Sequence, residues 1–253
     1  MDIIAKISKG SKMDQIYLPK NRSGFFTGQY VVIQPIEVTK EISKPFFYGT
    51  KSLETIKVRI IEEIFALIEK KTMPENIIIT GSFLESGYRF NDIDIIIVGK
   101  ELVGLQKEIE QIIGVKAHII FIDNPSLIEG LNTDPLYQLM LSRCVSLKRI
   151  IYKIEPKINY PLLDLHLLKS KALIDNFEMF DGNEKYYLIR NMVAIMLFIK
   201  HKKISQEQVN KEIKKLFNLE VIQIKNNLLN KDFLNKYKDI YNKTFNLIMK
   251  QNE

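Results

Sequence analysis

One stretch, residues 77–98 with the sequence IIITGSFLESGYRFNDIDIIIV, constrains the fold of this chain more than any other. Two isoleucine-rich runs flank a Gly–Ser turn and a polar segment, which predicts buried strands at 77–80 and 92–98. Alternate residues of a strand point to the same face of a sheet. Asp92 and Asp94 are therefore expected side by side on one face, with the neighbouring isoleucines packed on the other.

The residue types in this stretch indicate a site for a metal-bound phosphate. Two adjacent carboxylates repel each other unless a cation lies between them. Mg²⁺ suits such a pair, since it binds through one or two carboxylates together with substrate phosphates. Gly81 allows the backbone to approach a ligand closely. Ser82, at the start of a helical turn, offers a hydroxyl and backbone N–H groups to a phosphate.

The spacing of these residues resembles a known signature. Gly81–Ser82, then nine residues, then Asp92 and Asp94 between apolar flanks is similar to the DNA polymerase β-type nucleotidyltransferase superfamily, and most closely to its minimal members. The resemblance covers residues 55–150. It implies transfer of a nucleoside monophosphate from an NTP to an acceptor, with nucleotide binding at Gly81 and Ser82. It also implies two Mg²⁺ ions, with Asp92 and Asp94 as metal ligands. The alternative is a hairpin whose two aspartates are a solvated strand face.

Two positions depart from the family pattern. The family places a third carboxylate near the middle of the strand expected at 115–122, where this chain has His118. Imidazole is a poor Mg²⁺ ligand, so the catalytic role expected for His118 is that of general base on the acceptor hydroxyl. The alternative is a structural strand histidine. Glu85 stands where the family often has arginine, and Arg89 is the candidate replacement at the nucleotide. A solvated loop arginine is the other interpretation of Arg89.

The pattern along the whole chain predicts an α+β protein. A small mixed β-sheet nucleotidyltransferase core with helices is expected at 51–152, between an N-terminal β-hairpin module at 1–45 and a C-terminal α-helical bundle at 160–253. A linker is expected at 39–50. The core is expected to contain helices at 52–71, 102–113 and 135–141 and strands at 77–80, 92–98, 115–122 and 145–152. The bundle is expected to contain helices at 162–177, 185–202, 206–217, 221–229 and 232–250.

The N-terminal segment ISKGSKMDQIYLPKNRSGFFTGQYVVIQPI resembles the AbrB-type swapped-hairpin module of transcription regulators and antitoxins. Strands are expected at 3–8, 15–19 and 30–36, although the connection from Pro19 to Gly28 is shorter than in that family. The resemblance implies a homodimer and phosphate contacts to DNA. The side chains it assigns to DNA binding are Lys6, Lys9, Lys12, Lys20 and Arg22. The alternative is a small β extension with solvated lysines.

Composition narrows the expected partners and the expected cellular location. The net charge of +7 favours polyanionic partners such as nucleotides or nucleic acid. Cys144 is the single cysteine, so an intrachain disulfide is excluded and a reducing, cytoplasmic location is expected. No apolar run is long enough to span a bilayer, so a membrane partner is not expected.

Two functions follow from the sequence. The first is a Mg²⁺-dependent nucleotidyltransferase whose acceptor is RNA such as tRNA, a protein or a small hydroxyl compound. The second is a DNA-binding regulator, or an antitoxin with a toxin-type protein partner, whose nucleotidyltransferase fold is inactive or only binds nucleotide. Two features favour the second function: His118 stands where the family has a third carboxylate, and the N-terminal segment is AbrB-like.

Overall fold

The computed structural model describes residues 7–18, 20, 24–31, 44–50, 52–88, 90–229 and 231–250. The chain divides into two compact units, residues 1–40 and 41–253. The sheet and the helical region, which the sequence assigned to separate segments, lie within the second unit.

The first unit contains a short antiparallel pair of strands. β1 (Ile7–Ser8) pairs with β2 (Gln15–Ile16). These strands lie within two of the three strands expected there. The third, expected at 30–36, falls largely outside the described residues.

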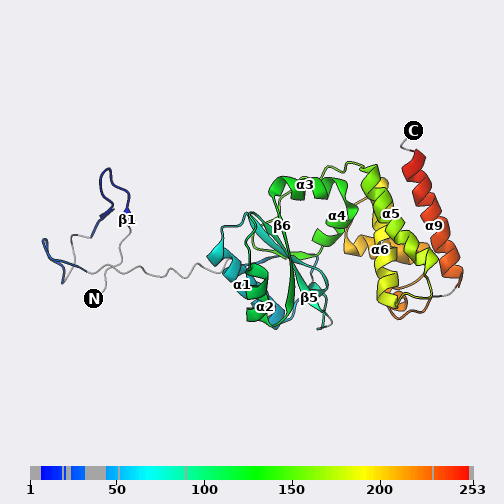
Figure 1. The fold of residues 1–253 in the computed structure, drawn as a ribbon, viewed down its shortest axis with the longest axis horizontal. Coiled ribbons are helices and arrows are strands. Elements are labelled where there is room, and N and C mark those ends of the chain that lie inside the picture. The colour runs from blue at the N-terminus through cyan, green and yellow to red at the C-terminus, as the bar shows by residue number, and fades with distance from the viewer. Residues whose placement is uncertain are drawn as a thin grey trace. The chain divides into compact units, whose positions relative to one another are not determined.

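The second unit is built on a mixed five-stranded sheet. Its strands are β3 (Phe46–Tyr48), β4 (Asn76–Thr80), β5 (Asp92–Val98), β6 (Lys116–Ile122) and β7 (Cys144–Ser146). They lie in the order β3-β7-β4-β5-β6, with β5 and β6 parallel and the other neighbours antiparallel. The α+β class predicted from the sequence is therefore confirmed (Figure 1).

One face of the sheet carries an extended apolar layer. Helices α1 (Thr55–Lys71) and α2 (Leu105–Ile113) pack on it. Ile93, Ile95 and Ile97 of β5 point into this layer and are fully buried. Each such side chain contributes about 1.5–3 kcal/mol of burial free energy, which fixes the register of β5 and hence the face of its aspartates.

The opposite face is covered over only part of its length. Helices α3 (Asn124–Thr133) and α4 (Pro135–Leu141) pack on the half that carries Ile96 and Val98. The beginning of β5, with Asp92 and Asp94 on the same face, remains partly exposed. Asp92 and Asp94, at the partly exposed starting end of β5, thus form an acidic edge of this face beside its apolar layer.

The helical region follows a break that contains Pro156. It comprises α5 (Tyr160–Asp175), α6 (Gly182–Ile199), α7 (Gln206–Phe217), α8 (Val221–Lys225) and α9 (Lys231–Lys250). The second half of α6 is buried almost all round, which is typical of a central helix surrounded by partners. Within the described residues, no helix is long and apolar enough to cross a membrane.

Three local expectations need correction. The segment expected as a linker contains β3, because Phe46–Tyr48 pairs along β7 at the sheet edge. β7 ends at Ser146 rather than at residue 152, and the Ser146 hydroxyl donates to the carbonyl of Lys148 where the chain leaves the sheet. The third difference is α3, which the sequence did not predict; Asp123 caps it by accepting from the backbone N–H of Ser126 at 2.7 Å.

Candidate functional site

Asp92 and Asp94 form the centre of the site. Both lie half-buried on the same face of β5, as the strand period requires, while Ile93 between them is fully buried on the other face. In the parallel register with β6, Lys116 lies beside Asp92 and His118 beside Asp94. Four polar side chains therefore occupy one corner of the sheet.

The Gly–Ser turn lies directly against Asp94. Thr80, the last residue of β4, is the register partner of Asp94, and Gly81 follows it with a φ of +84°. A β-carbon at Gly81 would overlap the Asp94 carboxylate. The left-handed backbone and the close carboxylate both require glycine here. The structure thus brings together the two halves of the site that the sequence singled out.

The electrostatics of Asp94 reflect its surroundings. Burial is the main cause that raises the pKa of Asp94, and the neighbouring charge of Asp92 adds to it. His118 opposes these effects through Nδ1, which lies 3.4 Å from Oδ1 of Asp94. A carboxylate with a raised pKa gains most from a nearby cation, because the cation offsets both the desolvation and the repulsion.

The donor set at this site suits Mg²⁺ only in part. The two carboxylates supply the hard oxygen ligands that Mg²⁺ takes from protein when substrate phosphates complete its shell. Within the described part of the chain, no three acidic, histidine or cysteine side chains gather in a way that could hold a metal. The residues fit one ion shared with a phosphate. A second ion would rely on His118, whose nitrogen suits softer metals.

The turn after Gly81 is fixed by cations from distant parts of the chain. Ser82 begins the short 3₁₀ helix η1 (Ser82–Leu84) and is exposed. Glu85 follows it and contacts Nη2 of Arg143 at 2.9 Å and Nζ of Lys225 at 3.5 Å. Burial alone would raise the pKa of Glu85, but Arg143 and Lys225 together hold it below its ordinary value. Two cationic side chains, Arg143 and Lys225, therefore lie at the end of the turn beside the carboxylate of Glu85.

A buried lysine holds the loop that follows. Lys57 of α1 is fully buried, and its ammonium donates to the carbonyls of Glu85 and Gly87 at 2.5 and 2.6 Å. Its third partner is the Glu54 carboxylate at 3.2 Å. The rings of three aromatic residues surround it: Phe83, Tyr88 and Phe90. The loop between β4 and β5 is thereby tied to α1 rather than left to solvent.

The other predicted site residues are either exposed or outside the described residues, and Cys144 is a separate case. Lys9, Lys12 and Lys20 of the first unit are exposed, as a DNA contact requires and as a solvated lysine would also be. Arg22 and Arg89, together with Lys6, lie outside the described residues. Cys144 is buried and its thiol donates to the carbonyl of Leu141; burial raises its pKa to about 12, which disfavours the thiolate.

Sequence reasoning missed Arg143, Lys225 and Lys57. The first two lie 58 and 140 residues from Glu85 along the chain, so no local spacing could have pointed to them. Lys57 stands on the apolar face of α1, and a lysine on the buried stripe of a helix is a signal that could have found it.

Comparison with known proteins gives no relative from which the role of the site could be taken. No family model, no curated protein and no solved structure matches the chain.

Proposed function

We propose that this protein is a Mg²⁺-dependent nucleotidyltransferase of the DNA polymerase β type, which moves a nucleoside monophosphate from an NTP to an acceptor hydroxyl. The observation that carries the proposal is the close packing of Gly81 against Asp94 at a partly exposed edge. A turn that places backbone N–H groups beside paired carboxylates supports binding of a metal-bound triphosphate.

The residues would share the work as follows. Asp92 and Asp94 would hold Mg²⁺, which supplies charge neutralisation at the transferring phosphoryl group. Gly81 and Ser82 would hold the terminal phosphates through backbone N–H groups. His118 would accept the proton of the acceptor hydroxyl as that oxygen attacks the α-phosphorus and pyrophosphate leaves. Positioning by the turn and the strand edge would supply much of the rate.

The experiment uses the full chain with each of the four α-labelled NTPs, Mg²⁺ and three acceptor classes: tRNA, a partner protein and small hydroxyl compounds. We expect label transfer that is lost with EDTA and falls at least about 1,000-fold in Asp92→Ala and Asp94→Ala. Glu101→Ala, an exposed carboxylate outside the site, is the matched control. Transfer that persists in both aspartate variants would remove this edge from the mechanism.

A second candidate function is nucleotide binding without transfer. His118 favours it, because this histidine stands beside Asp94 where a two-metal mechanism needs a third carboxylate. In that case Mg²⁺-dependent NTP binding would be lost in Asp94→Ala, while no acceptor would become labelled.

The N-terminal unit supports a regulatory role in this second case. Its described lysines are exposed, and so are the large apolar side chains of Met13, Tyr17, Phe26 and Tyr30. A unit with this much exposed apolar surface is suited to pairing with a second copy, as the AbrB-like pattern implies. DNA binding through Lys9, Lys12 and Lys20 would weaken steeply with salt. The buried single cysteine is consistent with work in the cytoplasm.

A further inference from the structure

Three cationic side chains share one carboxylate beside the Gly–Ser turn. Arg143, between α4 and β7, and Lys225, at the end of α8, pair with Glu85 at 2.9 and 3.5 Å. Arg190 of α6 lies near enough to Arg143 and Glu85 for their charges to affect its pKa. Four segments that are distant along the chain therefore bring three positive charges and one negative charge together.

Arg190 is the cation of this cluster without an acidic partner of its own. Its guanidinium donates to Oδ1 of Asn191 at 3.3 and 3.1 Å and lies over the ring of Tyr187 at 4.7 Å. Among the residues that the structure describes, no carboxylate forms an ion pair with it. Burial is the main cause that lowers the pKa of Arg190, and the charge of Arg143 acts in the same direction. Because a buried cation without a counterion is costly, Arg190 gains from an added anion.

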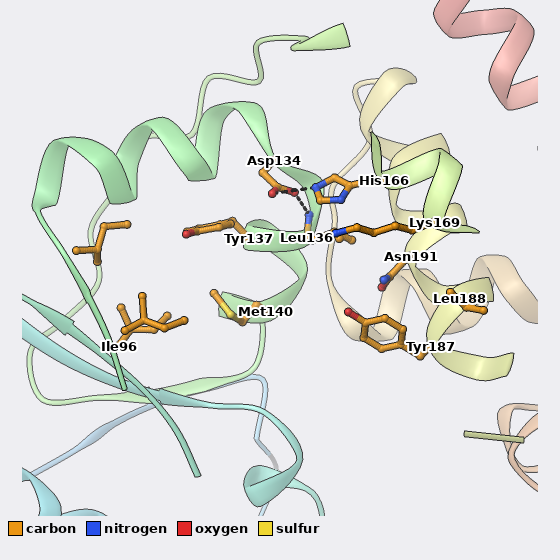
Figure 2. A pocket seen from close by; sticks show the side chains of 12 residues that line it. Ile96, Asp134, Leu136, Tyr137, Met140, His166, Lys169, Tyr187, Leu188 and Asn191 are labelled. Carbon is orange, nitrogen blue, oxygen red and sulfur yellow. Dashed lines mark hydrogen bonds and ion pairs between the residues drawn. The ribbon is translucent and has the colours of Figure 1, made fainter. Parts of the chain in front are cut away.

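The two partners of Arg190 line a cavity of about 290 Å³ between the sheet and α6 (Figure 2). Ile96 of β5 and Met140 of α4 are among its other lining residues. Ile96 follows Asp94 by two residues on the same face of β5, so the cavity borders the site described above. Its volume lies near the lower limit of small-molecule sites. A compact ligand at Arg190 would therefore have the Gly–Ser turn on one side and this space on the other.

Glu85 is held so that its side chain can move without its backbone. The backbone carbonyl accepts from Nζ of Lys57 at 2.5 Å, whereas the carboxylate contacts Arg143 and Lys225. The side chain is 43% exposed, which leaves the carboxylate free to turn toward solvent. Arginine binds carboxylate and phosphate oxygens with the same planar set of donors. The position of the Glu85 carboxylate therefore marks where an anionic group of a ligand fits.

We propose that Arg143, Arg190 and Lys225 form a subsite for the terminal phosphates of a nucleotide, which displace the Glu85 carboxylate when they bind. The identity of this anion rests on the proposed function, because Glu85 directly follows the turn that would hold those phosphates. A partly buried cluster beside a cavity suits a compact polyphosphate better than the backbone of a polymer. Glu85 then acts as an internal competitor of the nucleotide.

The first test measures binding of inorganic tripolyphosphate to the full chain by isothermal titration calorimetry, with and without Mg²⁺. Arg190→Gln should weaken tripolyphosphate by about tenfold, because charge-assisted hydrogen bonds are lost. Arg190→Lys keeps the charge and should lose less affinity. Lys171→Gln removes the same charge on α5, where Lys171 pairs with Asp175, and should leave the affinity unchanged.

The second test separates a ligand subsite from an ion-pair network that only stabilises the fold. Glu85→Gln removes the competing carboxylate and keeps the backbone contact to Lys57, so tripolyphosphate should bind about threefold to tenfold more tightly. Glu101→Gln, an exposed position outside the cluster, makes the same change in net charge and should not tighten binding. A gain in affinity cannot come from partial unfolding. Unchanged or weaker binding in Glu85→Gln overturns the proposal.

Other results would also overturn the subsite. They are an absence of tripolyphosphate binding at about 10 mM, an unchanged affinity in Arg190→Gln, and a single-stranded RNA that requires Arg190 when tripolyphosphate does not. Label transfer tests the proposed function separately. Affinity changes as expected without any label transfer would refute the transferase and keep the polyphosphate subsite. Label transfer with unaltered tripolyphosphate affinities would refute the subsite alone.

Discussion

The Asp94–His118 and Asp134–His166 pairs join the same two side-chain types at similar distances, 3.4 and 3.1 Å. Their settings differ. The side chains of the first pair are 35% and 65% exposed, whereas both side chains of the second are 11% exposed. The open pair lies beside a second carboxylate and a glycine turn. The closed pair links α4 to α5 and is held in one orientation. Burial, rather than residue type, is what distinguishes the two pairs.

Apart from loss of the carboxylates themselves, the largest effect is expected at Gly81, which packs against the open pair. Gly81→Ala places a β-carbon in the Asp94 carboxylate and should lower label transfer by about 100-fold, since small misplacements at a reacting centre cost that much. Gly104→Ala is the control, because Gly104 has a φ of +85° with nothing near its β position. Equal losses in the two variants would mean that backbone strain, and not the carboxylate, explains the effect. If the chain only binds nucleotide, the same comparison applies to Mg²⁺-dependent NTP affinity.

Loss of the closed pair should lower the free energy of unfolding clearly. Asp134→Ala removes the cap of α4 and leaves a buried imidazole without its partner, so the free energy of unfolding should fall by about 2–3 kcal/mol. Asp134→Asn keeps the cap and should lose less. Urea denaturation of the three proteins measures the difference. A loss below about 0.5 kcal/mol in Asp134→Ala would show that the pair contributes little to the fold.

The substitution His118→Asp converts the open pair into an acidic triad. His118→Asp places a carboxylate beside Asp94 in the register of β5 and β6, and added ligand charge should tighten Mg²⁺ binding by roughly tenfold. His118→Asn is the matched control and should not tighten it. Calorimetric titration with Mg²⁺ in the presence of a non-hydrolysable NTP measures the change. Unchanged affinity in His118→Asp would place the metal away from β6.

The smallest effect concerns the charge of Asp94. Because its pKa is raised in the fold, the native state binds a proton more readily than the unfolded chain, and stability falls as pH rises from the ordinary value toward the folded value. Asp94→Asn removes this penalty. Without metal, it should be more stable than the parent at pH 7, by less than about 1 kcal/mol because the site is partly exposed. The advantage should vanish below the ordinary pKa, which thermal melts across pH can check. A loss of stability at pH 7 would contradict the assigned cause.

The sequence predicted that Asp92 and Asp94 share one face, and it missed the Asp134–His166 pair, for physical reasons. Strand period alone places Asp92 beside Asp94, and a continuous run of isoleucines fixes which face they occupy. The partners of Asp134 and Glu85 come from other elements, so they depend on how helices pack and not on local spacing. β3 was missed because its three residues gain regular structure only by pairing with β7. The cap of α3 was in the sequence, since Asp123 precedes Asn–Pro–Ser, a helix-start pattern.

Glu85 has a mechanical consequence for the turn that it follows. Its carboxylate forms ion pairs with Arg143 ahead of β7 and with Lys225 at the end of α8, while its backbone carbonyl accepts a hydrogen bond from Lys57. A displacement of α8 therefore pulls on the Gly–Ser bend through a single side chain. The position of α8 and the orientation of the backbone beside Asp94 are therefore linked through Glu85.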